Sequence, residues 1–444
     1  MMIYLLLVLV ILLTLLSIFF TRDILSPPSI LCCSYLLAVV CTIIYSSMTD
    51  WEIEIHGYTV MLISAALVCF IFFFLLTVFA KRNHIIRTGP IENLDAERIL
   101  GTFTILLIVD FFIAALFVFF FFKQVGLADT ISSFNNHMNT IKMTNYYATE
   151  LNRILPAWVT GLSKYTRALA YVAIYVLADL VILKKGKYSF CRKVLLLECV
   201  ISIILYTPIV ILSTGRWNLI VLLCAGLIMI YIVYIKKSGG TVSFDAGIYF
   251  KILFYVSCVC ILFVSLSQFV GRLQNRTIFE DVVMHFGGSI QNLDLFLENP
   301  IPESDIFGKE TFYSLHRLLY QLGIDKSFYT IHLEFRSKDG INMGNVYTGI
   351  RECYYDFGFW GVVVLMSFLG CFFGRMYRKV MSRESKRIDI NVIWYSIALS
   401  LIFFHSFSES FYRSYISLDY LLLYIIILMI ILSIDKINIK LSRR

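Results

Sequence analysis

The chain alternates between long apolar blocks and shorter polar connections, and the blocks have the length of membrane-spanning helices. A helix needs about 20 apolar residues to cross the hydrocarbon core of a bilayer. The pattern predicts about eleven spans, at approximately 2–20, 29–48, 58–80, 99–122, 157–183, 194–213, 217–235, 248–270, 357–378, 390–407 and 416–434. We therefore expect an all-α polytopic membrane protein.

One polar interval, residues 271–356, is far longer than any other connection. It separates an N-terminal bundle of about eight spans, residues 1–270, from residues 357–444, which hold about three spans and a tail. A segment of about 85 residues forms only a marginal core by itself. We therefore expect this large loop to pack on the bundle as a lid and to provide the polar surroundings that chemistry requires.

Two helices are predicted within the large loop. Apolar residues recur at helical spacing from Phe279 to Leu297, while acidic and amide residues occupy the other faces. This amphipathic helix should lie along the membrane surface and end at Asn299-Pro300. A second, shorter helix is expected from about Phe312 to Leu322, with Gly323 as its stop.

Lysine and arginine are concentrated in alternate connections, and this bias indicates the orientation of the chain. The basic set comprises Lys81, Arg82, Arg87, Lys184, Lys185, Lys187, Arg192, Lys193, Lys236, Lys237, Arg378, Lys379, Arg383, Lys386, Arg387 and the tail residues Lys436, Lys440, Arg443 and Arg444. All of them fall on one side if every predicted span is real. We therefore expect the N-terminus and the large loop to be outside and the C-terminus to be cytoplasmic.

Composition agrees with a membrane protein and excludes several other classes. The chain is 59% hydrophobic and 15% charged, with a net charge of +8, whereas a soluble domain is about a quarter charged. Since most cations belong to the predicted cytoplasmic connections, the positive charge does not indicate a nucleic-acid partner. Most of the 11 cysteines lie in apolar blocks, so no disulfide framework is expected. Metal-ligand spacings and nucleotide-binding motifs are absent from the sequence, and we expect no metal and no cofactor.

Arginines near the predicted outer surface are the first candidates for chemistry. Arg216 begins a span after the turn Ser213–Gly215, and Arg272 and Arg276 are four residues apart where another span ends. A guanidinium group binds phosphate through two parallel hydrogen bonds. The alternatives are that Arg216 anchors a helix end at the interface and that the other two are solvated or bind lipid headgroups.

Acids and histidines supply the remaining candidates. Arg351 and Glu352 are adjacent, so one short segment offers a cation for phosphate and a carboxylate for a hydroxyl. Asp356 has two readings, as a reactive carboxylate or as an N-cap of the following span. His316 lies earlier in the large loop, directly before the cation Arg317. His405, Glu409 and Arg413 should lie at the outer end of the tenth span and face the same compartment.

Three short motifs carry a resemblance to a known family. Thr214–Trp217 opens a span, Gly344–Thr348 lies in the large loop, and Tyr355–Gly361 leads into the next span. This arrangement resembles the oligosaccharide repeat-unit polymerases, the Wzy-type O-antigen and capsule polymerases, and the similarity of layout covers nearly the whole chain. Members of this family are also similar to the O-antigen ligases and share a membrane glycosyltransferase architecture of the C type.

The resemblance implies a reaction at the outer face of the bacterial plasma (inner) membrane. A glycan on undecaprenyl pyrophosphate would be transferred to the non-reducing end of another lipid-linked repeat unit. The implied partners are the lipid-linked donor and acceptor, the bilayer and a chain-length regulator protein. Arg216 matches the family's arginine at the outer start of a span, and Arg276 with Gly287 fits an arginine–glycine spacing of external loops.

The chemistry of this reaction suits the residues named above. Departure of pyrophosphate builds negative charge, which clustered arginines stabilise without a metal. We therefore expect Arg216, Arg272, Arg276 and Arg351 to bind pyrophosphate. The acceptor hydroxyl must lose a proton, and the candidate bases are Glu352, Asp356 and His316.

Two other functions fit the sequence less well. An O-antigen ligase, or another glycosyltransferase that uses lipid-linked sugars, would differ in its acceptor, which the sequence does not reveal. A flippase should show repeat symmetry and helices broken at midplane, and neither is evident in the sequence.

Overall fold

The computed structural model describes residues 1–49, 51–80, 94–126, 155–182, 189–213, 216–237, 278–302, 304–325, 331–382 and 387–441. At several helix ends it describes only the backbone, and Arg216 is one of these positions. The predicted span 248–270 and the candidates Arg272 and Arg276 lie outside the described residues.

The chain forms two compact units, and each combines segments that are far apart in the sequence. The first unit contains Met1–Ile85, Arg276–Ser382 and Ala398–Tyr420. The second unit contains Ile86–Asn275, Arg383–Ile397 and Leu421–Arg444. The large loop therefore shares a unit with the first three predicted spans, whereas the rest of the expected N-terminal bundle, residues 86–270, belongs to the other unit.

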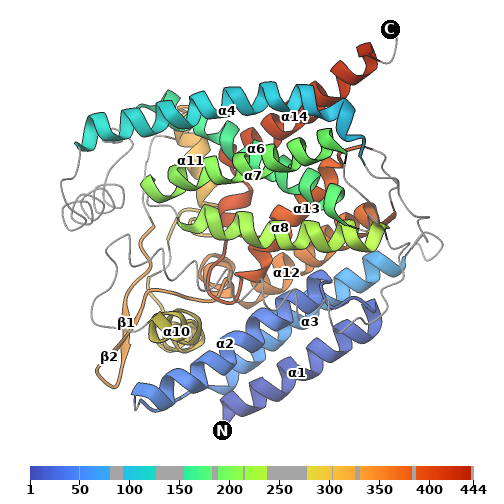
Figure 1. Ribbon diagram of the computed structural model, residues 1–444. Coiled ribbons are helices and arrows are strands. Elements are labelled where there is room, and N and C mark those ends of the chain that lie inside the picture. The colour runs from blue at the N-terminus through green and yellow to red at the C-terminus, as the bar shows by residue number, and fades with distance from the viewer. Residues whose placement is uncertain are drawn as a thin grey trace. The chain divides into compact units, whose positions relative to one another are not determined.

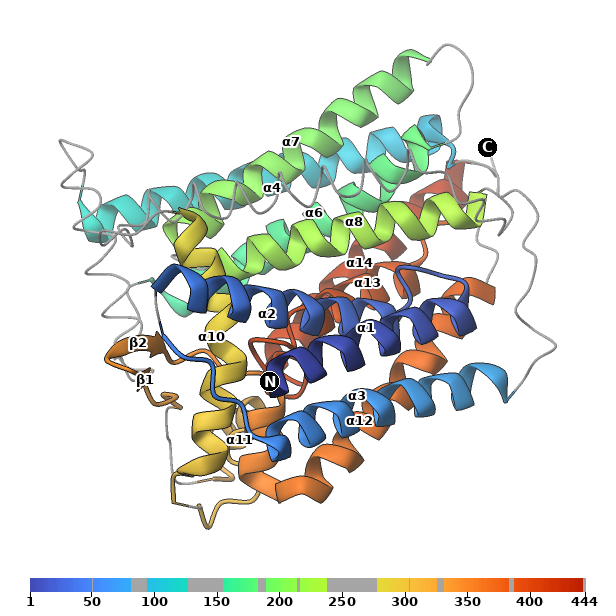
Figure 2. The same cartoon turned by 90° about the horizontal axis from the view of Figure 1, so that it is seen from below.

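Long helices form the body of the first unit (Figures 1 and 2). They are α1 (Met2–Thr21), α2 (Pro27–Thr49), α3 (Gly57–Phe79) and α12 (Ile350–Ser382). The helices α3 and α12 pack closely, and a Cβ at Gly370 would meet the carbonyl oxygen of Phe70. Membrane helices lack a hydrophobic drive to associate, so small residues that let backbones approach strengthen their packing.

The predicted amphipathic helix is present as α10 (Ile278–Glu298), which runs across α2 (Figure 2). A Cβ at Gly287 would lie 2.6 Å from the carbonyl oxygen of Cys41, and Thr42 Oγ1 donates to the carbonyl of Gly287 at 2.8 Å. The expectation of an outward polar face is wrong for Asn292 and Asp294, which are both buried. Asn292 Nδ2 donates to the carbonyl of Val346 at 2.9 Å, and Asp294 accepts from the amide of His56 at 2.9 Å, so these side chains have polar partners that compensate for burial.

The large loop also contains the short helix α11 (Tyr313–Gln321), which confirms the second prediction. Gly323 follows it with φ +71°, and its N–H donates to the carbonyl of Tyr320 at 3.0 Å. This left-handed conformation is favourable for glycine and ends the helix.

A small antiparallel hairpin departs from the all-α expectation. Its strands are β1 (Arg336–Lys338) and β2 (Ile341–Gly344). The turn residues Asp339 and Gly340 have φ values of 52° and 78°. Two consecutive positive φ angles are typical of a tight hairpin turn, and Asp-Gly favours this conformation. This dipeptide is the signal in the sequence from which the hairpin could have been predicted.

The helix α12 begins seven residues before the predicted span and is broken at Gly358, where φ is 62° and ψ is −162°. Residues with a side chain avoid this conformation. Asp356 therefore lies inside α12, and the expectation that it caps the following span is wrong. Its carboxylate instead accepts hydrogen bonds from the amides of Glu310 and Thr311.

The second unit is built from α4 (Ala96–Val125), α6 (Ala157–Val181), α7 (Phe190–Leu212), α8 (Arg216–Lys237), the start of α13 (Ile390–Phe403) and most of α14 (Leu418–Leu441). Within this unit α7 packs against α4, α6 and α8. Polar residues join its helices, because Thr104 donates to Glu198 at 2.7 Å and Ser202 donates to Asp110 at 3.3 Å. These contacts give Asp110 and Glu198 a role in packing between the helices.

Among the described residues, eight helices are long and apolar enough to cross a membrane. The two other predicted spans within these ranges form α6 and the shorter apolar helix α13. The helices begin and end within a few residues of most predicted bounds. The chain is therefore a mostly helical protein with the features of a multi-pass membrane protein.

Segments predicted to share one side of the membrane contact each other in the first unit. The amide of Glu52, in the connection between α2 and α3, donates to Asp339 at 3.1 Å, and Gln291 donates to the carbonyl of Glu54 at 2.9 Å. At the other end of the helices, Tyr377 donates to Asp23 at 2.8 Å. The connection and the large loop thus lie at the same end of the bundle, as the charge pattern predicts.

The second unit gives the same result for the basic connections. The amide of Leu94 donates to Asp179 at 2.7 Å, and Lys237 pairs with the same carboxylate at 2.9 Å. Lys236 lies 3.4 Å from Asp389. Three connections that the sequence predicts to be cytoplasmic therefore meet at one end of this unit.

Candidate functional site

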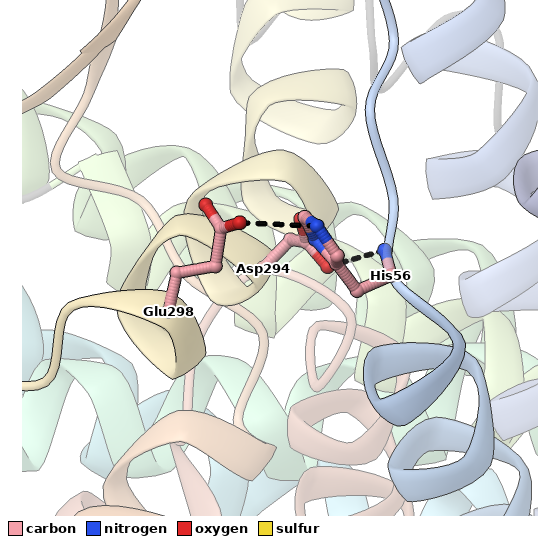
Figure 3. Close-up of side chains that lie close together, drawn as sticks. All are labelled: His56, Asp294 and Glu298. Atoms are coloured by element: carbon pink, nitrogen blue, oxygen red, sulfur yellow. Dashed lines mark hydrogen bonds and ion pairs between the residues drawn. The ribbon is translucent and has the colours of Figure 1, made fainter.

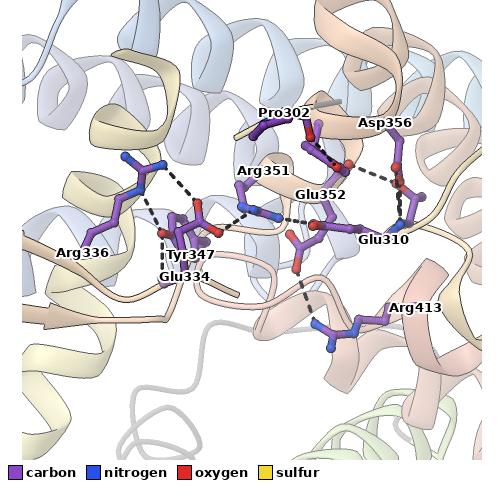
Figure 4. A network of polar contacts seen from close by, with 11 residues as sticks. Pro302, Glu310, Glu334, Arg336, Tyr347, Arg351, Glu352, Asp356 and Arg413 are labelled. Carbon is purple, nitrogen blue, oxygen red and sulfur yellow. Dashed lines mark hydrogen bonds and ion pairs between the residues drawn. The ribbon is translucent and has the colours of Figure 1, made fainter. Parts of the chain in front are cut away.

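A network of buried charges lies in the first unit, where the large loop meets the start of α12 (Figure 4). Arg351 is at its centre and has no exposed surface. Its guanidinium group pairs with Glu310 through Nη1 and with Glu334 through Nη2 at 2.8 Å. It also lies 4.6 Å from the ring centroid of Phe296 and 5.0 Å from that of Tyr347. These contacts fix the arginine in place and neutralise its charge.

Arg336 extends the network toward α10. It donates to the carbonyls of Leu295 and Asn299, both at 2.7 Å, and pairs with Glu334 at 3.1 Å. The carbonyls at a helix C-terminus carry partial negative charge and lack intrahelical donors. Arg336 therefore fixes the end of α10 beside the network.

Glu352 follows Arg351 along α12 and is 1% exposed. Its Oε1 lies 3.8 Å from Nη1 of Arg413, the only cation paired with it in the part of the chain that the structure describes. Its Oε2 has no hydrogen-bond partner among the described residues. A buried carboxylate oxygen without a donor is unfavourable and is available to bind a ligand.

Arg413 links Glu352 to the segment after α13. This segment contains η3, a π-helical turn over Phe411–Tyr415. Glu409 lies just before the turn and accepts hydrogen bonds from the amides of Tyr412 and Arg413 at 3.1 and 2.8 Å. The prediction that Glu409 and Arg413 face the same compartment as the large loop agrees with these contacts. Arg413 keeps 26% of its side chain exposed, so it reaches the surface from the network.

His405 belongs to the same end of the first unit but to another set of contacts. Its Nδ1 lies 3.0 Å from the hydroxyl of Tyr35, and its backbone carbonyl accepts from the amide of Gly349 at 2.7 Å. A Cβ at Gly349 would lie 2.9 Å from Nε2 of His405. The glycine that ends the motif Gly344–Gly349 is therefore required for close approach of this ring.

Carboxylates outnumber cations in the described part of this network. The acids are Glu310, Glu334, Glu352, Asp356 and Glu409, and the cations are Arg336, Arg351 and Arg413. Clusters in which acids share few cations hold protons more tightly than isolated acids. Such perturbed groups occur often at functional sites.

The pKa values of the acids outside the helices reflect this imbalance. Burial raises the pKa of Glu409 to about 8, and burial also raises the pKa of Glu310 to about 7 despite the neighbouring Arg351. Burial acts on Glu334 in the same direction, but Arg351 and Arg336 outweigh it and lower the pKa of that carboxyl. The network therefore contains acids that hold protons near neutral pH beside an acid that stays ionised.

The predicted site residues have different places in the structure. Glu352 and Asp356 lie in the network with Arg351, whereas His316 lies on the outer side of α11, where its Nε2 is 2.8 Å from the carbonyl oxygen of Phe307. Arg216 is the first residue of α8 in the second unit, and the structure describes its backbone but not its side chain. Its expected convergence with Arg351, and that of Arg272 and Arg276, stays a prediction.

Sequence reasoning missed Glu310 and Glu334, the two carboxylates that pair with Arg351. They are 41 and 17 residues away from it, and neither belongs to a recognisable motif. The one signal was chemical, because a buried arginine requires acidic partners. It shows that the arginine requires acidic partners, but it does not show which acidic residues these are.

This arrangement can do two things chemically. Glu352 can accept a proton from a hydroxyl group, provided that the hydroxyl approaches its unpaired oxygen. Arg413 can stabilise negative charge beside it.

No protein-family model, curated protein or solved structure matches this chain.

Proposed function

We propose that this protein polymerises lipid-linked oligosaccharide repeat units at the outer face of the bacterial plasma membrane. It transfers the glycan from undecaprenyl pyrophosphate to the non-reducing end of a second lipid-linked unit. The observation that carries the proposal is Glu352, a buried carboxylate with one unpaired oxygen beside Arg413, at the loop end of the long helices. The motifs Gly344–Thr348 and Tyr355–Gly361 flank this residue.

Glu352 acts as the general base in this proposal. The acceptor hydroxyl donates its proton to Glu352 while its oxygen attacks the anomeric carbon, and the sugar–pyrophosphate bond breaks. A carboxylate that lacks donors at one oxygen is a better proton acceptor than one whose oxygens are both bonded. Because Glu352 is 1% exposed, the acceptor reaches it only when neighbouring groups such as Arg413 move aside. Movements of this kind accompany substrate binding in many enzymes.

Arginines stabilise the leaving pyrophosphate. Arg413 is the described cation that lies beside Glu352 and also reaches the surface, and we add it to the predicted set of Arg216, Arg272 and Arg276. Arg351 has another role, because Glu310 and Glu334 already bind its guanidinium group. It holds the large loop on α12 and thereby positions Glu352.

Deletion of the gene in a producing strain tests the function. A polymerase mutant should display surface glycan one repeat unit long. Expression of the native chain should restore the ladder of long chains, and the Glu352→Gln variant should not. The Asp305→Asn variant, which removes an exposed carboxylate of the same loop, should restore the ladder and serves as the matched control.

The same experiment separates the alternatives. A ligase mutant accumulates long lipid-linked chains, and a flippase mutant traps single units on the cytoplasmic face. Either result would contradict the proposal. A full ladder with Glu352→Gln would leave the polymerase function standing but remove Glu352 from the reaction.

A further inference from the structure

A second cluster of side chains lies at the junction of α10 and α3, apart from the network around Glu352 (Figure 3). His56 immediately precedes α3, while Asp294 and Glu298 are four residues apart on α10. One ligand atom from each residue lies within 4.8 Å of the others. Residues at this spacing on a helix share one face, and both carboxylates point toward the imidazole ring (Figure 3).

Both ring nitrogens of His56 face carboxylate oxygens. Nδ1 lies 2.9 Å from Oδ2 of Asp294, and Nε2 lies 3.1 Å from Oε1 of Glu298. A neutral imidazole has one N–H group and one lone pair. One of the two carboxylates would then face a lone pair at close range, which is repulsive. Either a second proton or a metal ion between nitrogen and oxygen relieves this repulsion.

The surrounding contacts hold Asp294 in one orientation. The residue is 1% exposed, and its Oδ1 accepts hydrogen bonds from the amide of His56 at 2.9 Å and from the hydroxyl of Thr59. Its Oδ2 is thereby directed at Nδ1 of the ring. A carboxylate that accepts the second N–H of a metal-binding histidine fixes the tautomer and the ring orientation. Asp294 meets this description, and the nitrogen left for a metal is Nε2.

Glu298 completes the arrangement. Zinc lies about 2.0–2.2 Å from imidazole nitrogen and carboxylate oxygen, which at a tetrahedral angle separates these two atoms by about 3.3 Å. The observed separation of 3.1 Å between Nε2 and Glu298 Oε1 fits this value. Side-chain exposures of 55% for His56 and 41% for Glu298 leave access for an ion and for water ligands.

We propose that His56 Nε2 and the carboxylate of Glu298 bind a divalent transition-metal ion such as Zn²⁺, with Asp294 orienting the ring. Mixed imidazole and carboxylate ligands suit first-row ions of this kind. The ion joins α10 to the start of α3 and so fastens the large loop to the bundle. It takes no part in glycan transfer. The sequence does not reveal the site, because 238 residues separate His56 from Asp294.

Titration of the purified full-length protein in lipid nanodiscs with ZnCl₂, followed by calorimetry, tests the proposal. A pH of about 8 limits competition from protons, since the hydrogen bond to Asp294 raises the pKa of His56. One equivalent of Zn²⁺ should bind to the native chain. The variants His56→Gln and Glu298→Gln should each weaken binding by about tenfold or more.

Matched controls use exposed residues of the same types in the same unit. His332→Gln and Asp305→Asn should bind Zn²⁺ as the native chain does. Replacement of Zn²⁺ by Co²⁺ should give visible absorption bands that the His56→Gln variant lacks, which reports imidazole ligation directly. Absence of binding by the native chain, or equal binding by all four variants, would overturn the proposal and leave the cluster as an ion pair.

Discussion

In the second unit, each of two buried lysines faces one carboxylate. Lys236 pairs with Asp389, and Lys237 pairs with Asp179. In the first unit, Arg351 faces two carboxylates, and Glu352 has only the distant nitrogen of Arg413. The two lysines are therefore balanced pair by pair, whereas the described network around Arg351 holds more carboxylates than cations.

Under the proposed function, this difference separates charges that hold the fold from charges that take part in the reaction. A buried ion pair roughly offsets the desolvation of its two charges, so the lysine pairs can persist as fixed joints between helices. An excess of buried carboxylate costs stability, because each uncompensated charge loses hydration. Structures retain such costs mostly where a reaction uses them.

The largest effect should come from Glu352→Gln. Removal of the general base is expected to lower the rate of chain growth by about 10²- to 10⁴-fold, measured with purified lipid-linked repeat units in proteoliposomes. Because the variant also removes an uncompensated buried charge, its unfolding temperature should stay the same or rise. A fall in stability together with normal polymerisation would contradict the assignment of Glu352 as a functional charge.

Arg351→Met should destabilise the first unit by about 3–5 kcal/mol, because Glu310 and Glu334 would lose their shared cation. Denaturant unfolding in mixed micelles measures this change. Addition of Glu310→Gln to the variant should recover part of the loss. If the single variant were as stable as the native chain, the arginine would not hold the loop on α12.

Gly287→Ala should cost about 1–3 kcal/mol, because the new methyl group would meet the backbone of Cys41 in α2. Gly101, in α4 of the second unit, has nothing within 4 Å of the equivalent position. Gly101→Ala should therefore leave stability unchanged or raise it by up to about 1 kcal/mol. The same denaturant experiment compares the two variants, and equal effects would mean that α10 does not depend on close contact with α2.

The smallest effect concerns pH. Glu409 and Glu310 have pKa values of about 8 and about 7 in the folded chain, raised by burial from an ordinary value of 4.5. At pH values between the ordinary pKa and the raised pKa of each group, the folded state binds more protons than the unfolded state. The free energy of unfolding should therefore fall as pH rises from about 5 to about 8. Unfolding temperatures across this range measure the slope. Glu409→Gln should make the slope shallower, whereas an unchanged slope would assign the dependence to other groups.

Local sequence patterns predicted most of the helices. The apolar blocks placed α1, α2 and α3 within a few residues of their observed ends, because about 20 consecutive apolar residues have one stable conformation in lipid. The stop at Gly323 was also predicted, since a left-handed residue after a helix favours glycine.

The polar contacts between distant segments could not be predicted in the same way. Glu310 and Arg351 meet because the segment just before α11 folds against the start of α12, and nothing local to Glu310 distinguishes it from other acids. The polar residues of α10 were expected at the surface, since amphipathic spacing does not show that Asp294 has hydrogen-bond donors in Thr59 and in the backbone of His56. Hydrophobic periodicity specifies which face is apolar, whereas tertiary packing decides which polar face is covered.

The break at Gly358 has a mechanical consequence for α12. Residues 350–357 carry Glu352 and Asp356, and residues 359–382 continue for the length of a span. A continuous helix would act as a rigid lever, and any tilt of its anchored part would displace the reactive carboxylate. Because Gly358 interrupts the helix, we expect that the span can tilt with changes in bilayer thickness while the segment before it keeps its alignment.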